Sequence, residues 1–379
     1  MIAAAVAAIA AMSAAPAPVV DLYTMGQGDQ LFERFGHAAI CVQWPADADA
    51  RCYNYGTTDF GSPPARLGWQ FLRGTARFWV SVWPRERMIA QYVARDRSVW
   101  RQRLPLTDDQ ARELARRLAH DAREENRYYA YHHFRDNCAT RVRDHIDAVT
   151  GGALSRDNQR PIGVTYRELG RRGLAELTPI LVASVFLVGR FADVQPTGYE
   201  AMFLPDLLRA GVAERLGAAP EAVYLRRGPA FPTEGNSVAP WLLAIAAATV
   251  APVAAARALG RGVRAGSWAS AAALTALGTA VWTVALAAGM PELRWNEVAL
   301  VLWPSDALLA TRRGRAYGRL RVVALALVSA ARAVGVLRQP LWLVVLIPLG
   351  PALIAALAPL RGETESRRSP RDAAREHAP

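Results

Sequence analysis

One cysteine of the sequence stands where a helix could make it a nucleophile. Asp136 and Asn137 are residues that cap helix N-termini well, and residues 138–149 carry apolar side chains at helical spacing. Cys138 is therefore predicted in the first helical turn. Free backbone N–H groups and the positive end of the helix dipole favour a thiolate there and supply donors for an oxyanion. This position predicts thiol chemistry at Cys138, although a small buried cysteine would suit it too.

The other two cysteines bear on whether Cys138 is free. Cys41 and Cys52 flank a polar, turn-rich segment, VQWPADADAR, between two strand-like runs. If they face each other across a hairpin in an exported protein, they form a disulfide, and Cys138 is the cysteine left over. A chain with all three cysteines reduced remains the alternative.

A cysteine nucleophile needs a base, and the base needs an acceptor that orients it. If the disulfide forms, antiparallel register places Ala39 opposite Asn54, with His37 one diagonal step away on the same face. His37 is therefore predicted as the base and Asn54 as its orienting residue. The alternative is that His37 is a hydrogen-bonded histidine of the core.

The segments around these residues show both strand-like and helical patterns. The strand-like segments include VVDLYTM, RCYNYGTTDF and TARFWVSVW, and the helical ones include GWQFLRG, TPILVASVFLVG and the amphipathic TDDQARELARRLAHDAREE. Thr107 is predicted to cap the last of these helices, and His120 and His145 are expected on helix surfaces. The mixture predicts an α+β domain over residues 20–235.

The chain is strongly basic. Its 379 residues carry a formal net charge of +12, and because the sequence has no lysine, arginine supplies all the basic side chains. The arginine clusters lie beside long apolar runs, a pattern typical of membrane topology rather than of nucleic-acid binding. The composition predicts a membrane protein without a nucleic-acid partner.

The first 19 residues have features of an export signal. They contain an apolar run followed by small residues with A-x-A-like cleavage points, but they lack a charged first region. Residues 1–19 are therefore predicted to be a signal peptide or an N-terminal anchor, and residues 20–235 an exported domain.

The composition turns strongly apolar from Pro240 onward, and residues 236–361 are predicted to form a transmembrane domain. Its apolar segments are roughly 240–256, 267–289, 296–310, 322–337 and 340–360. Arginine-rich stretches follow the first, third and fifth segments, and the positive-inside rule places them in the cytoplasm with the tail, 362–379. Residues 20–235 would then lie at the periplasmic face of the inner membrane.

The third apolar segment is short and contains Trp303-Pro304-Ser305-Asp306. It is expected to be a kinked helix whose Asp306 reaches the cytoplasmic interface. A re-entrant segment that lines a cavity is the alternative.

Four blocks of the exported part resemble the bacterial Lnb family: FERFGHAAICV, YNYGTTDF, FLRGTARFWV and YHHFRDNCATRVRD. WNEVALVLWPSD is similar to the membrane half of that family. The resemblance implies an exported domain followed by an all-α, multi-span membrane domain. It also implies a lipoprotein intramolecular transacylase, which moves an acyl chain from the glyceryl group of a lipidated N-terminal cysteine to the α-amine of that cysteine. The expected partners are the membrane and a lipidated lipoprotein or phospholipid substrate.

The order of the histidine and the cysteine also resembles the permuted papain-like fold of NlpC-type proteins and of lecithin:retinol acyltransferase. That likeness implies a catalytic set of Cys138, His37 and Asn54. Residues expected to contact the substrate are Arg34, Tyr55, Arg73, Arg77, Arg135 and Asn137. No metal site and no cofactor is expected.

Two other functions stay open at this point. The same cysteine and histidine would cleave amides if water replaced the amine, as in a membrane-tethered cysteine peptidase or amidase that acts on cell-wall peptides. A non-catalytic envelope binding protein, in which Cys138 is structural, is the other.

Overall fold

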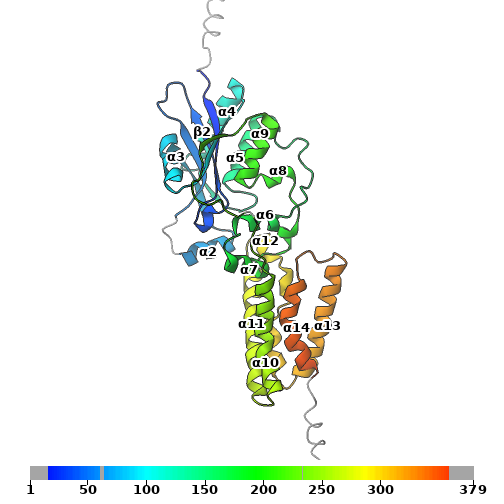
Figure 1. Cartoon of the computed structure of the whole chain (residues 1–379). Helices are drawn as coiled ribbons and strands as arrows, with labels where there is room; N and C mark the ends of the chain where they lie inside the picture. Colours follow the sequence, from blue (N-terminus) through cyan, green and yellow to red (C-terminus); the bar gives the residue numbers. More distant parts are fainter. Residues whose placement is uncertain (1–15, 60–63, 233, 358–379) are drawn as a thin grey trace, which may run out of the picture. The chain divides into compact units, whose positions relative to one another are not determined.

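The computed structural model describes residues 16–59, 64–232 and 234–357 (Figure 1). Most of the predicted leader and the whole predicted tail therefore lie outside the described residues. The chain divides into two compact units. Unit 1 comprises Met1–Leu181, Phe191–Asn236 and Ala288–Met290, and unit 2 comprises Val182–Arg190, Ser237–Ala287 and Pro291–Pro379.

Unit 1 is built on an antiparallel sheet that has seven strands within the described residues, in the order β6-β4-β3-β2-β1-β5-β7. The strands are β1 (Val19–Met25), β2 (His37–Gln43), β3 (Arg51–Thr57), β4 (Arg77–Pro84), β5 (Val99–Arg103), β6 (Tyr128–Ala130) and β7 (Glu221–Tyr224). The strand predictions for VVDLYTM, RCYNYGTTDF and TARFWVSVW correspond to β1, β3 and β4. An antiparallel sheet combined with helices confirms the predicted mixture of α and β structure.

Helices cover both faces of this sheet. They are α2 (Pro64–Leu72), α3 (Arg85–Ala94), α4 (Asp108–Asp121), α5 (Cys138–Val149), α6 (Tyr166–Gly173), α8 (Gly198–Ala201) and α9 (Pro205–Leu216), with the 3-10 turns η1 (Leu31–Glu33) and η2 (Arg190–Asp193). Helices α4, α5 and α9 pack on one face through a shared apolar core, and α3 packs on the other (Figure 1). The helix α7 (Thr178–Leu187) begins in unit 1 and ends in unit 2.

The amphipathic segment before the candidate site forms α4 as predicted. The side chain of Thr107 accepts a hydrogen bond from the Gln110 backbone N–H, which satisfies one of the free donors at the helix start. Leu114 and Leu118 are fully buried against the sheet. Their spacing of four residues gives α4 one apolar face, and the arginines and glutamates lie on the other.

The β2–β3 hairpin has the predicted register. Ala39 pairs with Asn54, and Cys41 pairs with Cys52. A disulfide joins these two cysteines, and Cys138 carries a free thiol. Because Met25 of β1 pairs with His37, the histidine lies at the end of the sheet where β1 finishes and β2 begins.

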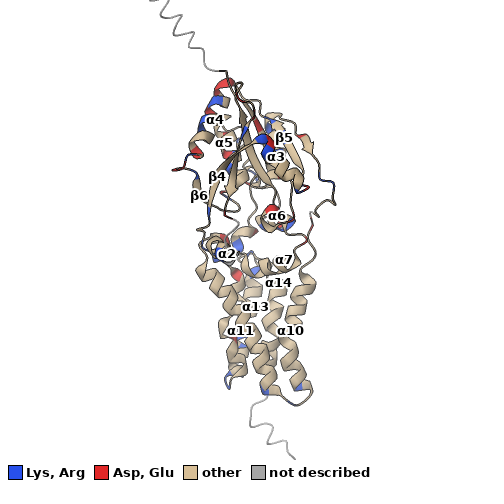
Figure 2. Cartoon of the chain, turned by 90° about the vertical axis from the view of Figure 1, so that its left-hand side faces the viewer, with Lys and Arg blue, Asp and Glu red and all other residues tan. Residues whose placement is uncertain are grey.

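Unit 2 is helical. It contains α10 (Ala239–Ala258), α11 (Val263–Ala287), α12 (Pro291–Arg294), α13 (Gly314–Ala333) and α14 (Trp342–Ala356), with the 3-10 turns η3 (Glu297–Leu300) and η4 (Pro304–Ala310). Figure 2 shows few charged residues along α10, α11 and α14. Among the described helices, α10 and α11 are long and apolar enough to cross a membrane. The prediction of helices is confirmed for the first, second, fourth and fifth apolar segments.

The expectation for the third apolar segment is wrong. It forms two 3-10 turns rather than a kinked helix, and Asp306 is fully buried instead of reaching an interface. The Nε atom of Arg321 donates to Asp306 Oδ1 at 2.7 Å, and the Arg321 guanidinium lies over the Trp303 ring, 4.2 Å from its centroid. A buried carboxylate is stable only when it is paired, and Arg321, fifteen residues further on, supplies that pair.

Candidate active site

Cys138 is the first residue of α5, and Asn137 determines where that helix starts. The Asn137 side-chain oxygen accepts hydrogen bonds from the Ala139 and Thr140 N–H groups, both at 2.9 Å. In return, the Thr140 hydroxyl accepts from the Asn137 N–H at 2.7 Å. This reciprocal cap holds the cysteine at the positive end of the helix dipole.

The side chain of Asn137 also ties the helix start to neighbouring segments. Its N–H₂ group donates to the carbonyl oxygens of His133 at 2.6 Å and Phe203 at 3.0 Å, while its oxygen accepts the two bonds of the cap. The residue is 3 % exposed, and both polar atoms of its side chain are hydrogen-bonded. Asn137 therefore positions Cys138, and its contact with substrate remains a prediction.

The environment of Cys138 holds the sulfur as a neutral thiol at rest. Burial raises the pKa of Cys138 above its ordinary value of 9.0. Backbone N–H groups of Ala38, Ala139 and Cys138 itself oppose that rise in pKa, and so does the positive charge of Arg97. These groups favour negative charge at the sulfur, so the site is prepared for a charge that develops during reaction.

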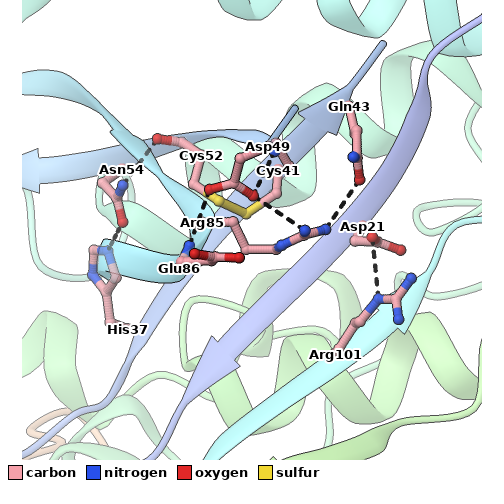
Figure 3. Close-up of a disulfide and its surroundings, with 11 residues drawn as sticks. Asp21, His37, Cys41, Gln43, Asp49, Cys52, Asn54, Arg85, Glu86 and Arg101 are labelled. Carbon is pink, nitrogen blue, oxygen red and sulfur yellow. Dashed lines mark hydrogen bonds and ion pairs between the residues drawn. A yellow bond between two sulfur atoms is a disulfide. The ribbon is translucent and has the colours of Figure 1, made fainter. Parts of the chain in front are cut away.

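His37 is held by Asn54, as the register predicts (Figure 3). The His37 Nε2 atom lies 3.3 Å from the Asn54 side-chain oxygen, and the Asn54 N–H₂ group donates to the Cys52 carbonyl at 3.0 Å. That second bond fixes the amide so that its oxygen faces the histidine. Because an amide oxygen can only accept a hydrogen bond, the proton of the His37 ring is assigned to Nε2. The lone pair of Nδ1 is then available to accept a proton.

The histidine is neutral at physiological pH. Burial and, to a smaller extent, the nearby charge of Arg97 lower the pKa of His37 to about 4, although the bond to Asn54 opposes the shift. The ring also stacks on Tyr92 of α3, with 6.0 Å between the ring centroids and 19° between the planes. A neutral, oriented imidazole of this kind can act as a general base.

The fold brings Cys138 and His37 into one region, although they are far apart in the sequence. The backbone N–H of Ala38, the residue that follows His37, lies close enough to the Cys138 sulfur to oppose the rise in the pKa of the thiol. Within the described residues, no direct hydrogen bond joins the sulfur to the His37 ring. Bonds of catalytic pairs are often long before substrate binds, so the pairing of Cys138 with His37 remains a prediction.

Arg97 is a residue of the site that the sequence did not single out. It is 3 % exposed, and it donates to the Gly26 carbonyl through Nε at 3.0 Å and through Nη2 at 2.9 Å. It also forms an ion pair with Glu33 at 3.3 Å and lies over the Tyr92 ring. These contacts fix the loop before β2 and bring a positive charge to the site. Nothing in the sequence separates Arg97 from the many other arginines.

The four arginines expected to bind substrate lie on separate segments of unit 1. Arg34 forms an ion pair with Glu176, and the Arg77 guanidinium lies 3.8 Å from the centroid of the Tyr128 ring. Arg73 is exposed just after α2, and Arg135 is exposed in the turn before α5. A pocket beside Arg77 is also lined by Thr58, Asp59, Leu67, Gln70, Trp79 and Tyr128. Contact of these arginines with substrate remains a prediction.

Tyr55 and His145 share one polar cluster. The surface position expected for His145 is wrong, and substrate contact by Tyr55 remains a prediction. Tyr55, expected to contact substrate, is fully buried, and its hydroxyl donates to Asp121 at 2.9 Å. His145, expected on a helix surface, lies with its Nε2 atom 2.9 Å from Asp121 and 2.8 Å from the Tyr55 hydroxyl. This cluster ties β3 to α4 and α5, because a buried hydroxyl and imidazole need polar partners.

The two pKa shifts predict how Cys138 reacts with a small alkylating agent. Raising the pH toward the elevated pKa of Cys138 increases the thiolate fraction, so alkylation by iodoacetamide should accelerate about tenfold per pH unit between about pH 6 and pH 8. Timed alkylation followed by mass spectrometry of the Cys138 peptide measures this rate. A constant rate between about pH 5 and pH 7 would instead indicate a resting thiolate–imidazolium pair and contradict the prediction.

The comparison with known families agrees with the resemblance. Residues 7–172 match the family model of the Lnb N-terminal periplasmic domain, and this segment contains His37, Asn54 and Cys138. No curated protein and no solved structure matches the chain. With its two candidate membrane helices, α10 and α11, the chain has the organisation of a membrane protein with a periplasmic domain. Residues 7–172 therefore form an Lnb-type N-terminal periplasmic domain, as the resemblance predicted.

Proposed function

We propose that this protein is a membrane-anchored, thiol-dependent acyltransferase of the inner membrane that acts on lipoproteins. Cys138 accepts an acyl chain from the diacylglyceryl group of a lipidated N-terminal cysteine and transfers it to the α-amine of the same cysteine. The observation that carries the proposal is the free thiol at the first turn of α5, close to the backbone of Ala38, which follows the neutral, Asn54-bonded His37. The Lnb-type domain supports a role in lipoprotein processing.

In the first half of the reaction, Cys138 forms a thioester. His37 Nδ1 takes the thiol proton as the sulfur attacks the ester carbonyl carbon, and backbone N–H groups at the start of α5 stabilise the resulting oxyanion. The ester C–O bond then breaks, and His37 returns its proton to the leaving glyceryl oxygen. The products are an acyl-Cys138 thioester and a lyso-glyceryl group.

In the second half, the thioester passes its acyl chain to an amine. The neutral α-amine of the lipidated cysteine attacks the thioester carbonyl, and His37 accepts the proton that the amine loses. The C–S bond breaks, and His37 protonates the departing thiolate, which restores the neutral pair. Ester and amine are converted into alcohol and amide without water or a cofactor, so the mass of the lipoprotein does not change.

The environment of the thiol agrees with this sequence of steps. Because both Cys138 and His37 are neutral at rest, the proton can move from sulfur to nitrogen during the attack itself. The predicted topology places unit 1 at the periplasmic face, where the lipidated cysteine of an exported lipoprotein is exposed to enzymes.

Expression of the protein in cells whose lipoproteins keep a free α-amine tests the proposal. We expect the lipoprotein N-terminal peptides to keep their mass while one acyl chain moves from the glyceryl group to the amine, as fragment-ion spectra show. A mass gain of one acyl chain would identify a separate phospholipid as donor and overturn internal transfer. Release of cell-wall peptides with unchanged lipoproteins would indicate a peptidase or amidase instead.

A further inference from the structure

Exposed apolar side chains gather at the end of the sheet where β2 begins with His37. Leu31 and Phe32 belong to η1, in the loop that leads into β2, and they are 43 % and 47 % exposed. Trp69 of α2 is 55 % exposed. The rings of Phe32 and Phe71 lie 6.4 Å apart, so η1 and α2 adjoin each other. Leu31, Phe32 and Trp69 are here called the apolar rim.

Charged side chains flank the apolar rim. In α2, Leu67 is buried toward the protein, whereas Trp69 is exposed. Arg66 and Arg73, before and after it in the chain, are also exposed. Tryptophan favours the boundary between hydrocarbon and water, and arginine binds lipid phosphate groups. This combination is typical of a helix that lies on a phospholipid surface.

A row of aromatic rings leads from the rim to the nucleophile. Phe71 lies between Phe32 and Tyr131, and its ring centroid is 5.8 Å from that of Tyr131. Tyr131 and Cys138 both border Gly56: a Cβ atom there would lie 3.6 Å from Tyr131 Cε2 and 3.7 Å from Cys138 Cβ. Successive contacts through these rings and Gly56 therefore link the apolar rim to the neighbourhood of the thiol.

We propose that the apolar rim inserts into the surface of the phospholipid bilayer and that an acyl chain enters along Phe71 and Tyr131 to reach Cys138. Insertion of the rim does not depend on the chemistry of the thiol. Entry of the acyl chain rests on the proposed acyl transfer. The lipid surface is favoured as occupant over a protein partner because the rim combines exposed apolar side chains, a tryptophan among them, with the exposed flanking arginines Arg66 and Arg73.

Insertion can be measured without catalysis. Full-length protein with Cys138→Ser and Trp69→Cys, and with the Cys41–Cys52 disulfide intact, is spin-labelled in nanodiscs of phosphatidylcholine and phosphatidylglycerol. The matched control places the label at Leu225→Cys, a position after β7 that is 57 % exposed. We expect the label at position 69 to collide mainly with oxygen, and the label at position 225 mainly with a water-soluble nickel chelate. Equal nickel accessibility at both positions would overturn insertion.

Entry of the acyl chain is tested with substitutions on the rim. The double variant Leu31→Ser, Trp69→Ser should lose about tenfold or more in acylation of Cys138 from a bilayer-embedded lipoprotein. Its reaction with water-soluble iodoacetamide should not change. The matched control, Val223→Ser with Leu225→Ser, should keep both activities. Undiminished transfer in the rim variant would overturn the path, whereas absence of transfer in the wild type, with insertion intact, would refute only the proposed chemistry.

Discussion

Replacement of Cys138 by alanine should reduce acyl transfer by at least about a thousandfold, because no other group can form the thioester. The cap at Asn137 uses backbone N–H groups of Ala139 and Thr140 and not the sulfur, so α5 should still begin at the same residue. Mass spectrometry of lipoprotein N-terminal peptides measures the loss. Trapping of an acyl-Cys138 thioester in the wild type, and its absence in the variant, links that loss to the nucleophile.

The control for this experiment replaces the other two cysteines of the chain, which form the disulfide. Replacing Cys41 and Cys52 together by alanine removes the disulfide but leaves the free thiol in place. Where this variant folds, it should still form the thioester at Cys138. Lipoprotein conversion at the wild-type rate by Cys138→Ala would show that the sulfur is not the nucleophile.

Replacement of His37 by glutamine should slow transfer about a hundred- to ten-thousandfold at pH 7, because the neutral thiol then has no base. The raised pKa of Cys138 makes the thiolate scarce at that pH. In the variant, the residual rate should therefore climb about tenfold per pH unit until the pH reaches the pKa of the thiol. Since the pKa of His37 is lowered to about 4, the wild type should keep its base down to that pH.

The matched control is His120→Gln. His120 of α4 has a side chain that is about half exposed, and its ring contacts Asp121 and Asn126. Its substitution should leave both the rate and the pH profile unchanged. A His37→Gln variant with the flat pH profile of the wild type would mean that another group takes the thiol proton.

Several parts of the candidate site follow from local sequence patterns. Asn137 before an apolar helical repeat specifies where α5 begins, because a cap acts within a few residues. The spacing of Cys41 and Cys52 around a turn-rich segment specifies the hairpin register, and the register brings Asn54 to His37. These features depend on contacts between residues near each other in the chain.

Other features were missed because they depend on contacts between distant segments. His145 has the spacing of a surface residue in α5, but α4 presents Asp121 and β3 presents Tyr55 to its ring. Asp306 was expected at an interface, but an arginine on another helix holds it in the interior. A charged or polar side chain that finds a buried partner overrides the preference that its local pattern expresses.

The sequence by itself determined the cysteine at a helix start, the hairpin that orients a histidine and the family to which the exported domain belongs. Only the tertiary structure decided that Arg97 lies at the site, that Asp121 pairs with Tyr55 and His145, and that the rings of Phe71 and Tyr131 lie close together. The physical reason is the distance along the chain between the residues that interact. Helix caps and hairpin registers are set by neighbours along the chain, whereas burial, charge and aromatic contact depend on which distant segments the fold packs together.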